Sequence, residues 1–146
     1  MNKERYKMPV SVQVILFNKN NEVLLLKRNS TGFSDGLYGF IGGHVEKNEM
    51  VINAAIRETK EEIGIDINRE DLVFKSVMNR KVDKNTEYID FVFIVKDWQG
   101  NIKNMEADKC SELVWCKPNN LPKNIIDFEK YLIDNQDVFL SWGWKT

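Results

Sequence analysis

Apolar residues in this chain recur with two different spacings, one typical of strands and one typical of helices. Runs rich in β-branched and aromatic residues predict strands at 10–18, 22–28, 38–40, 71–82, 86–98 and 111–117. A polar segment of turn composition, 19–21, separates the first two runs, so we expect those two strands to pair antiparallel. Apolar side chains at helix spacing predict one helix at 50–63 and a second one within 119–135.

The order of these elements is strand, strand, loop, helix, three strands and helix. It predicts an α/β fold in which a mixed sheet lies between helices. The 146 residues, 42% of them hydrophobic and 29% charged, suit one globular domain over 1–146 with a sizeable core.

The helix predicted at 50–63 has marked ends and two different faces. Asn48 is placed as an N-cap, and Gly64 as a left-handed residue that ends the helix. One face gathers the apolar residues with Thr59, whose hydroxyl can bond back to a carbonyl one turn earlier. A separate arc carries three carboxylates, Glu58, Glu61 and Glu62.

This crowding of carboxylates is unfavourable for the helix itself. Like charges three and four residues apart each cost about 0.2–0.5 kcal/mol. Acids in the last turn also oppose the helix dipole, at roughly 0.3–1 kcal/mol each. Arg57 can reach Glu61 and offsets only part of the cost. A solvated acidic face is the simplest interpretation, and a bound cation is the alternative that would remove the repulsion.

The surrounding residues favour the cation. From Gly43 to Ile65 the chain follows G-x5-E-x7-R-E-T-x-E-E-x-G-I, which resembles the Nudix box, G-x5-E-x7-R-E-U-x-E-E-x-G-U, where U is a bulky aliphatic residue. Seven fixed positions at set spacings match by chance on the order of once in 10⁸ starts. The matching residues are Gly43, Glu49, Arg57, Glu58, Glu61, Glu62 and Gly64.

Three positions depart from the common form of the box. Thr59 stands at the first aliphatic position, Ile41 where many members have proline, and Asn48 where glycine is frequent. None of these changes removes a carboxylate, so they affect the shape of the loop more than its chemistry.

The resemblance implies a Nudix fold, an α/β/α sandwich, and a site for Mg²⁺ that Mn²⁺ can also fill. In similar proteins the carboxylates matching Glu58, Glu61 and Glu62 hold the metal, and the carbonyl matching Gly42 joins them. The catalytic candidates are Glu58 and Glu61, and which glutamate acts as general base stays open. Hard oxygen ligands of this kind suit magnesium.

Other residues receive their roles from position in the resemblance. Arg28, at the end of a predicted strand, is a candidate for binding substrate phosphate, against an ordinary exposed arginine. Arg57 and Glu49 are expected to anchor the loop before the helix, with Gly43 and Gly64 as further structural positions. Asn124 matches a base-contacting position, although capping of the last helix is the stronger interpretation.

Charge and composition exclude several kinds of partner. Twenty-one basic and 22 acidic residues give a net charge of −1, so we expect neither nucleic acid nor membrane as partner. The first ten residues lack the apolar run of a signal peptide, which favours a cytoplasmic protein. Cys110 and Cys116 are expected to be free thiols, and His44, the one histidine, to have a structural role in its loop rather than contact phosphate.

The expected function is magnesium-dependent hydrolysis of the diphosphate linkage in a nucleoside diphosphate derivative, first of all a nucleoside or deoxynucleoside triphosphate giving monophosphate and pyrophosphate. The alternatives are a sugar nucleotide or dinucleoside polyphosphate as substrate, and a non-catalytic Nudix module that senses nucleotides. Homodimers are common among similar proteins, so a homodimer is one expected state.

Overall fold

The structure is a computed structural model that describes residues 3–145. Its strands form two sheets, one with the order β4-β1-β6-β5-β8 and one with the order β3-β2-β7. The strands are β1 (Val10–Leu16), β2 (Val23–Arg28), β3 (Tyr38–Gly39), β4 (Ile41–His44), β5 (Leu72–Lys81), β6 (Glu87–Val95), β7 (Cys110–Cys116) and β8 (Phe139–Trp142). The helices are α1 (Val51–Ile63), α2 (Asp127–Asp134) and a short 3₁₀ turn, η1 (Arg69–Asp71).

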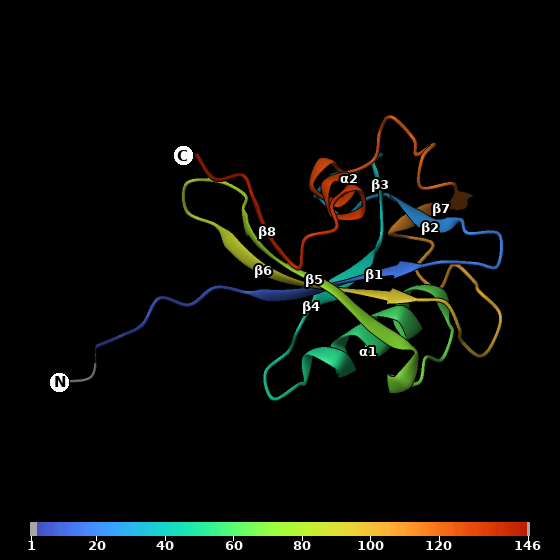
Figure 1. The fold of residues 1–146 in the computed structure, drawn as a ribbon, viewed down its shortest axis with the longest axis horizontal. Helices are drawn as coiled ribbons and strands as arrows, with labels where there is room; N and C mark the ends of the chain where they lie inside the picture. The colour runs from blue at the N-terminus through green and yellow to red at the C-terminus, as the bar shows by residue number, and fades with distance from the viewer. Residues whose placement is uncertain (1–2, 146) are drawn as a thin grey trace.

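The two α-helices cover opposite faces of the sheets (Figure 1). On β1, Val12 and Val14 point into the core that contains the buried residues of α1. Ile15, the residue after Val14, points into the other core, which also contains Phe128 and Leu132 of α2. Because successive side chains of a strand alternate between faces, a strand between two helices must be apolar on both. The predicted mixed α/β fold is confirmed, with the strands divided between two sheets.

The predicted antiparallel pairing of the first two strands is wrong. β1 and β2 lie in different sheets, and only an isolated bridge between Phe17 and Val23 joins them. β1 instead pairs with β4 antiparallel and with β6 parallel, while β2 pairs with β3 and β7. Both strands are buried on both faces, so the sequence pattern identifies them as strands but does not indicate which strands they pair with.

Helix α1 begins two residues later than an Asn48 cap would place it. The residue at its N-cap is Met50, without a side-chain cap bond, so the predicted cap by Asn48 is wrong. Asn48 instead adopts the left-handed conformation, with φ of 64°, in the loop before the helix. Asparagine is tolerated there better than most residues, which explains how it replaces the usual glycine. The predicted end of the helix is confirmed, because Gly64 has φ of 75° and donates its N–H to the carbonyl of Lys60.

The last helix is shorter than its sequence pattern predicts. α2 begins at Asp127 with Ile126 at the N-cap, so capping by Asn124 is wrong. The side-chain amide of Asn124 donates to the carbonyl of Gly36 at 3.0 Å instead. Strands β4 and β8 were not predicted, since glycines interrupt the first and the second is short.

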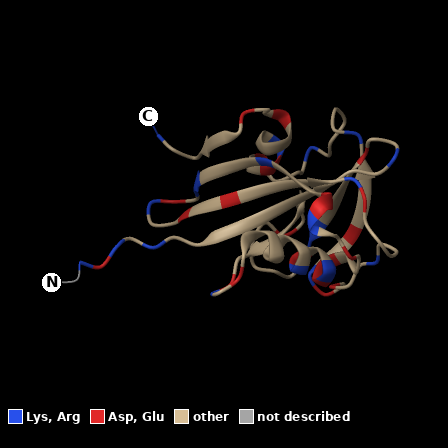
Figure 2. Ribbon diagram, turned by 60° about the horizontal axis from the view of Figure 1, so that its bottom comes forward, with Lys and Arg blue, Asp and Glu red and all other residues tan. Residues whose placement is uncertain are grey.

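Charged residues of both signs occur throughout the described part of the chain. Acidic and basic residues are interspersed along the ribbon (Figure 2). Among residues 3–145, no helix is both long enough and apolar enough to span a bilayer.

Candidate active site

The glycines before the helix bring the backbone of β4 against the acidic face of α1. Gly42 and Gly43 lie opposite Gln13 and Val12 of β1 in an antiparallel pair. The Gly42 N–H donates to Oε2 of Glu62 at 3.1 Å. A Cβ on Gly43 would lie 2.1 Å from the carboxyl carbon of Glu58, so only glycine leaves room for that side chain in its observed position.

Arg57 ties the loop to the helix. Its Nε and Nη2 donate to the two oxygens of Glu49 at 2.7 and 2.9 Å, and Nη2 also donates to the carbonyl of His44 at 2.9 Å. Hydrogen bonds from Arg57 hold the pKa of Glu49 down at about 2. This network confirms Glu49 as the partner of Arg57, and it joins the two ends of the loop between β4 and α1.

Arg57 also orients two of the three carboxylates. Nη1 donates to Glu58 at 2.9 Å and more loosely to Glu61 at 3.3 Å. The Glu58 side chain is only 15% exposed, whereas that of Glu61 is 51% exposed. Glu58 is therefore held near the sheet, while Glu61 lies at the rim.

The charged forms of Glu58 and Glu62 are destabilised by their surroundings. Burial raises the pKa of Glu58, against the lowering effect of Arg57. Burial raises the pKa of Glu62 still further, and the charge of Glu58 adds to this effect. Two desolvated carboxylates next to each other favour either a proton or a cation between them.

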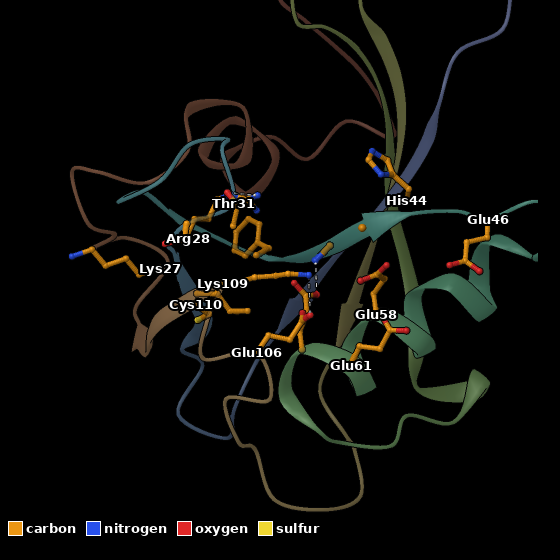
Figure 3. Close-up of a pocket in the computed structure, with 16 residues that line it drawn as sticks. Lys27, Arg28, Thr31, His44, Glu46, Glu58, Glu61, Glu106, Lys109 and Cys110 are labelled. Carbon is orange, nitrogen blue, oxygen red and sulfur yellow. Dashed lines mark hydrogen bonds and ion pairs between the residues drawn. The ribbon is translucent and has the colours of Figure 1, made fainter.

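These side chains line a cleft of about 570 Å³, which we call the box cleft. Figure 3 shows Glu58 and Glu61 on one wall and Arg28, Lys109 and Cys110 on the other. The lining residues are Leu26, Lys27, Arg28, Ser30, Thr31, Phe40, Gly42, Gly43, His44, Glu46, Glu58, Glu61, Glu62, Glu106, Lys109 and Cys110. One wall is thus acidic, and the other carries Arg28 and Lys109, with Nζ of Lys109 3.5 Å from Oε2 of Glu106.

Sequence reasoning missed Glu106 and Lys109. Both belong to the segment before β7 and line the box cleft. The charge of Glu106 helps to raise the pKa of both Glu58 and Glu62, which places a fourth carboxylate near the pair. No spacing in the sequence links Glu106 to the helix, so only the fold reveals it.

Arg28 stands where two cavities meet. It lines the box cleft and a neighbouring cavity of about 410 Å³, which we call the side cavity. Its Nε donates to the carbonyl of Phe33 at 2.7 Å and its Nη2 to the hydroxyl of Thr31 at 3.2 Å. The loop after β2 therefore holds the guanidinium in place. Asn124 lies near this loop through its bond to Gly36, outside the residues that line the two cavities.

His44 also lines both cavities, exposed and stacked on Tyr88 with ring centroids 5.7 Å apart. Thr59, at the position where the box has an aliphatic residue, is fully buried and donates its hydroxyl to the carbonyl of Ala55 at 2.8 Å. The predicted back-bond is confirmed, and it explains how a hydroxyl is accommodated on the core face.

The residues of the box cleft fit a hard divalent cation. Glu58, Glu61, Glu62 and Glu106 supply carboxylate oxygens, the ligand type that magnesium and manganese prefer. Within residues 3–145, no three acidic, histidine or cysteine side chains already converge as a finished ligand set. A cation would draw these carboxylates together, and it would compensate the charge of the buried Glu58–Glu62 pair.

Comparison with known proteins agrees with this geometry. The NUDIX domain family model matches residues 7–136. The ADP-ribose pyrophosphatase of Methanocaldococcus jannaschii is 34% identical over 127 residues, which are 87% of this chain and 70% of that protein. The CTP pyrophosphohydrolase of Escherichia coli is 28% identical over 109 residues, 75% of this chain and 76% of that protein.

Solved structures show the same fold. The MutT NUDIX hydrolase of Burkholderia pseudomallei has a TM-score of 0.79 at 23% identity and covers 88% of this chain and 98% of its own. The ORF135 protein of E. coli has a TM-score of 0.71 at 26% identity. The match covers 88% of this chain and 87% of that protein. With a family match over nearly the whole length and a shared fold, the chain belongs to the Nudix family and is a Nudix-type hydrolase.

Proposed function

We propose that the protein is a magnesium-dependent pyrophosphatase that cleaves the diphosphate linkage of a nucleoside diphosphate derivative, with a nucleoside or deoxynucleoside triphosphate as the first candidate. The observation that carries the proposal is the opposition of two charges across one cleft. Glu58 and Glu62, desolvated and adjacent, face a wall that carries Arg28 and Lys109. A cation would neutralise the charge of the acidic wall, and a polyphosphate would neutralise that of the basic wall.

In this proposal the metal and the side chains of the site have separate roles. Magnesium on the carboxylates would supply charge neutralisation at phosphate oxygens and a bound water of lowered pKa. Arg28 and Lys109 donate to phosphate oxygens and orient the chain of phosphates. Glu58 or Glu61 takes the proton of the attacking water. Water adds to one phosphorus, the bridging P–O bond breaks, and the second phosphoryl group leaves with the bridging oxygen.

The glycine backbone has a specific part in this arrangement. Gly42 and Gly43 line both cavities without side chains, so a phosphate can approach the strand closely. The Gly42 N–H orients Glu62, and the carbonyl of Gly42 is the backbone oxygen that we propose as a further metal ligand.

Several relatives are named for substrates that contain a nucleoside and a diphosphate. Their names include a CTP pyrophosphohydrolase and, over a shorter match of 64 residues, an 8-oxo-dGTP diphosphatase of Proteus vulgaris. The 34% match to an ADP-ribose pyrophosphatase supports the second candidate, a nucleoside diphosphate sugar. Retention of all three helix carboxylates argues against a module that only senses nucleotides, since without a cation they only repel one another.

A substrate screen tests the proposal directly. Nucleoside triphosphates, nucleotide sugars and dinucleoside polyphosphates are incubated with the protein with and without MgCl₂, and phosphate, pyrophosphate and nucleoside monophosphate are quantified. We expect monophosphate and pyrophosphate from at least one triphosphate, in the presence of magnesium only. Cleavage of nucleotide sugars alone would select the second candidate, and no cleavage in any class would contradict the proposal.

A further inference from the structure

The loop between β2 and β3, residues 29–37, is built around Arg28, and we call it the arginine loop. The backbone N–H of Arg28 donates to the carbonyl of Leu37 at 2.9 Å, and the carbonyl of Arg28 accepts the Gly36 N–H at 2.8 Å. The side chain of Arg28 donates two further hydrogen bonds to the middle of the same loop. The arginine and the loop therefore hold each other in place.

Alternate residues of the arginine loop have positive φ. Ser30, Gly32, Ser34 and Gly36 have φ of 55°, 81°, 53° and 84°. Glycine adopts such angles readily, whereas serine does so rarely. A disfavoured backbone persists only where the surrounding contacts determine it. The hydrogen bonds inside this loop therefore stabilise one particular shape.

Asp35 accepts three of these hydrogen bonds. Its Oδ1 accepts the N–H of Thr31 at 2.9 Å and lies 2.6 Å from the Thr31 hydroxyl, and its Oδ2 accepts the N–H of Gly32 at 3.1 Å. Bonds from the hydroxyl and the N–H of Thr31 hold the pKa of Asp35 below its usual value, so the carboxylate is charged at neutral pH. Asp35 is exposed and lines neither cavity, so any effect on a substrate is indirect.

The single proton of the Thr31 hydroxyl has two acceptors within reach. The hydroxyl oxygen lies 2.6 Å from Oδ1 of Asp35 and 2.8 Å from the carbonyl of Phe33. A charged carboxylate at the shorter distance is the stronger acceptor, so the proton is directed to Asp35. The lone pairs of the hydroxyl then accept the Phe33 N–H at 3.1 Å and Nη2 of Arg28 at 3.2 Å. The carbonyl of Phe33 is left to accept Nε of Arg28 at 2.7 Å.

These bonds occupy only one edge of the Arg28 guanidinium. Nε and Nη2 bind the loop, and the central carbon of the guanidinium lies 5.3 Å from the ring centroid of Phe33. A guanidinium has five N–H donors in one fixed plane, so the edge that carries Nη1 is not used by the two bonds. Figure 3 shows Arg28 and Thr31 on the same side of the box cleft, opposite Glu58. A phosphate with two oxygens matches the unused edge.

We propose that Asp35 and Thr31 are positioning residues for Arg28: the carboxylate directs the hydroxyl so that the loop holds one edge of the guanidinium and the other edge binds substrate phosphate. The inference rests on the proposed function, which assigns phosphate binding to Arg28. An arginine that is already ordered loses less conformational entropy on binding, so its affinity for phosphate is higher. Without Asp35, the Thr31 hydroxyl donates to the carbonyl of Phe33 and competes with Arg28 for it.

The order of the Arg28 side chain is measured by NMR on protein labelled with ¹⁵N-arginine, without metal or ligand. The Nε–H signal of Arg28 is assigned by its loss in Arg28→Ala. We expect this N–H to exchange with water about tenfold faster in Asp35→Ala and in Thr31→Val than in the wild type, because its hydrogen bond is weakened. Thr31→Ser retains the hydroxyl and should retain the wild-type exchange rate.

Binding of methylenediphosphonate with MgCl₂ tests whether this order serves phosphate. The non-hydrolysable diphosphate is titrated by isothermal calorimetry into the wild type and the same variants. We expect Kd to rise about tenfold in Asp35→Ala and in Thr31→Val, and to stay unchanged in Thr31→Ser. In protein that already contains Arg28→Ala, adding Asp35→Ala should have no further effect, because both changes act through one group.

Asp83→Ala is the matched control. Asp83 is exposed, accepts the Asn85 N–H at 2.8 Å in its own turn, and lines neither cavity. Its replacement removes the same charge as Asp35→Ala without touching Arg28, so Kd should keep its wild-type value. Melting temperatures of all variants, followed by circular dichroism, establish that each one is folded.

The opposing interpretation is that Asp35 only shapes the loop. In that case Asp35→Ala would weaken binding by the same factor with or without Arg28, since other residues of the loop line the cleft. That result, an unchanged exchange rate of the Arg28 Nε–H, or a wild type that binds the diphosphonate no more tightly than Arg28→Ala, overturns the proposal. Failure of the proposed function is distinguishable, because a protein that binds the diphosphonate through Arg28 and cleaves no nucleotide keeps the positioning and loses only the hydrolysis.

Discussion

Replacing Gly43 with alanine should disable the site while leaving the fold intact. The added Cβ would lie 2.1 Å from the carboxyl carbon of Glu58, whereas nonbonded carbon atoms prefer roughly 3.5–4.0 Å. The Glu58 carboxylate must therefore move by about 1.4 Å or more. A displacement of about 1 Å in a catalytic group can cost on the order of 100-fold in rate, so we expect kcat to fall about 100-fold.

Stability should change little in Gly43→Ala. Gly43 has no positive φ, so alanine adopts its backbone conformation without strain. The atoms that must move are the end of one flexible side chain, which is 15% exposed and can turn toward solvent. The melting temperature, followed by circular dichroism, should stay within a few degrees of the wild type.

A double-mutant cycle isolates the cause of the lost activity. Steady-state rates with magnesium and the best substrate of the screen are compared for Gly43→Ala, Glu58→Gln and the double variant. If alanine acts through Glu58, the double variant is no slower than Glu58→Gln alone. Asn53→Ala, at an exposed position of α1, is the control. Activity of Gly43→Ala within twofold of the wild type would refute the assigned role of Glu58.

Three further predictions concern charges of the site. Glu62→Gln should lower kcat about 100-fold or more with an unchanged circular dichroism spectrum, because a buried charge is lost at constant size; near-normal turnover would remove Glu62 from the mechanism. Arg28→Ala should raise KM about tenfold through a lost charge-assisted hydrogen bond, and an unchanged KM would argue against phosphate binding. The pKa of Glu49 is lowered from 4.5 to about 2 by Arg57, so its contribution to stability is present above pH 4.5 and is lost as the pH falls toward 2. Urea unfolding should therefore show that Glu49→Gln destabilises the protein more at pH 7 than at pH 3, whereas equal destabilisation would contradict the ion pair.

Local signals in the sequence predicted the helix of the box well. Apolar periodicity and the glycine at its end act within a short stretch of chain, so spacing determines them. The Arg57–Glu49 pair was expected from the resemblance, and the structure contains it. The N-terminal cap was less predictable, because Asn48 is favoured both at caps and in left-handed turns. The structure uses it in the turn.

Long-range relations were not predictable in the same way. β1 and β2 are apolar on both faces, so their pattern contains no information on which strands they join. Glu106 and Glu129 reach the two cavities from distant segments, and a single acidic residue in a loop or helix resembles many others. Arg28, assigned from its position in the resemblance, does line the box cleft. The homodimer and the cytoplasmic location stay predictions.

Binding of Mn²⁺ measured by electron paramagnetic resonance tests the central claim, a divalent cation held by the carboxylates of α1. Free Mn²⁺ is titrated with the wild type and with the double variant Glu58→Gln, Glu62→Gln, each with a non-hydrolysable methylene analogue of the best triphosphate. The account predicts that the wild type depletes the free signal beyond the analogue alone, and that the double variant does not. Equal depletion by both proteins would contradict it.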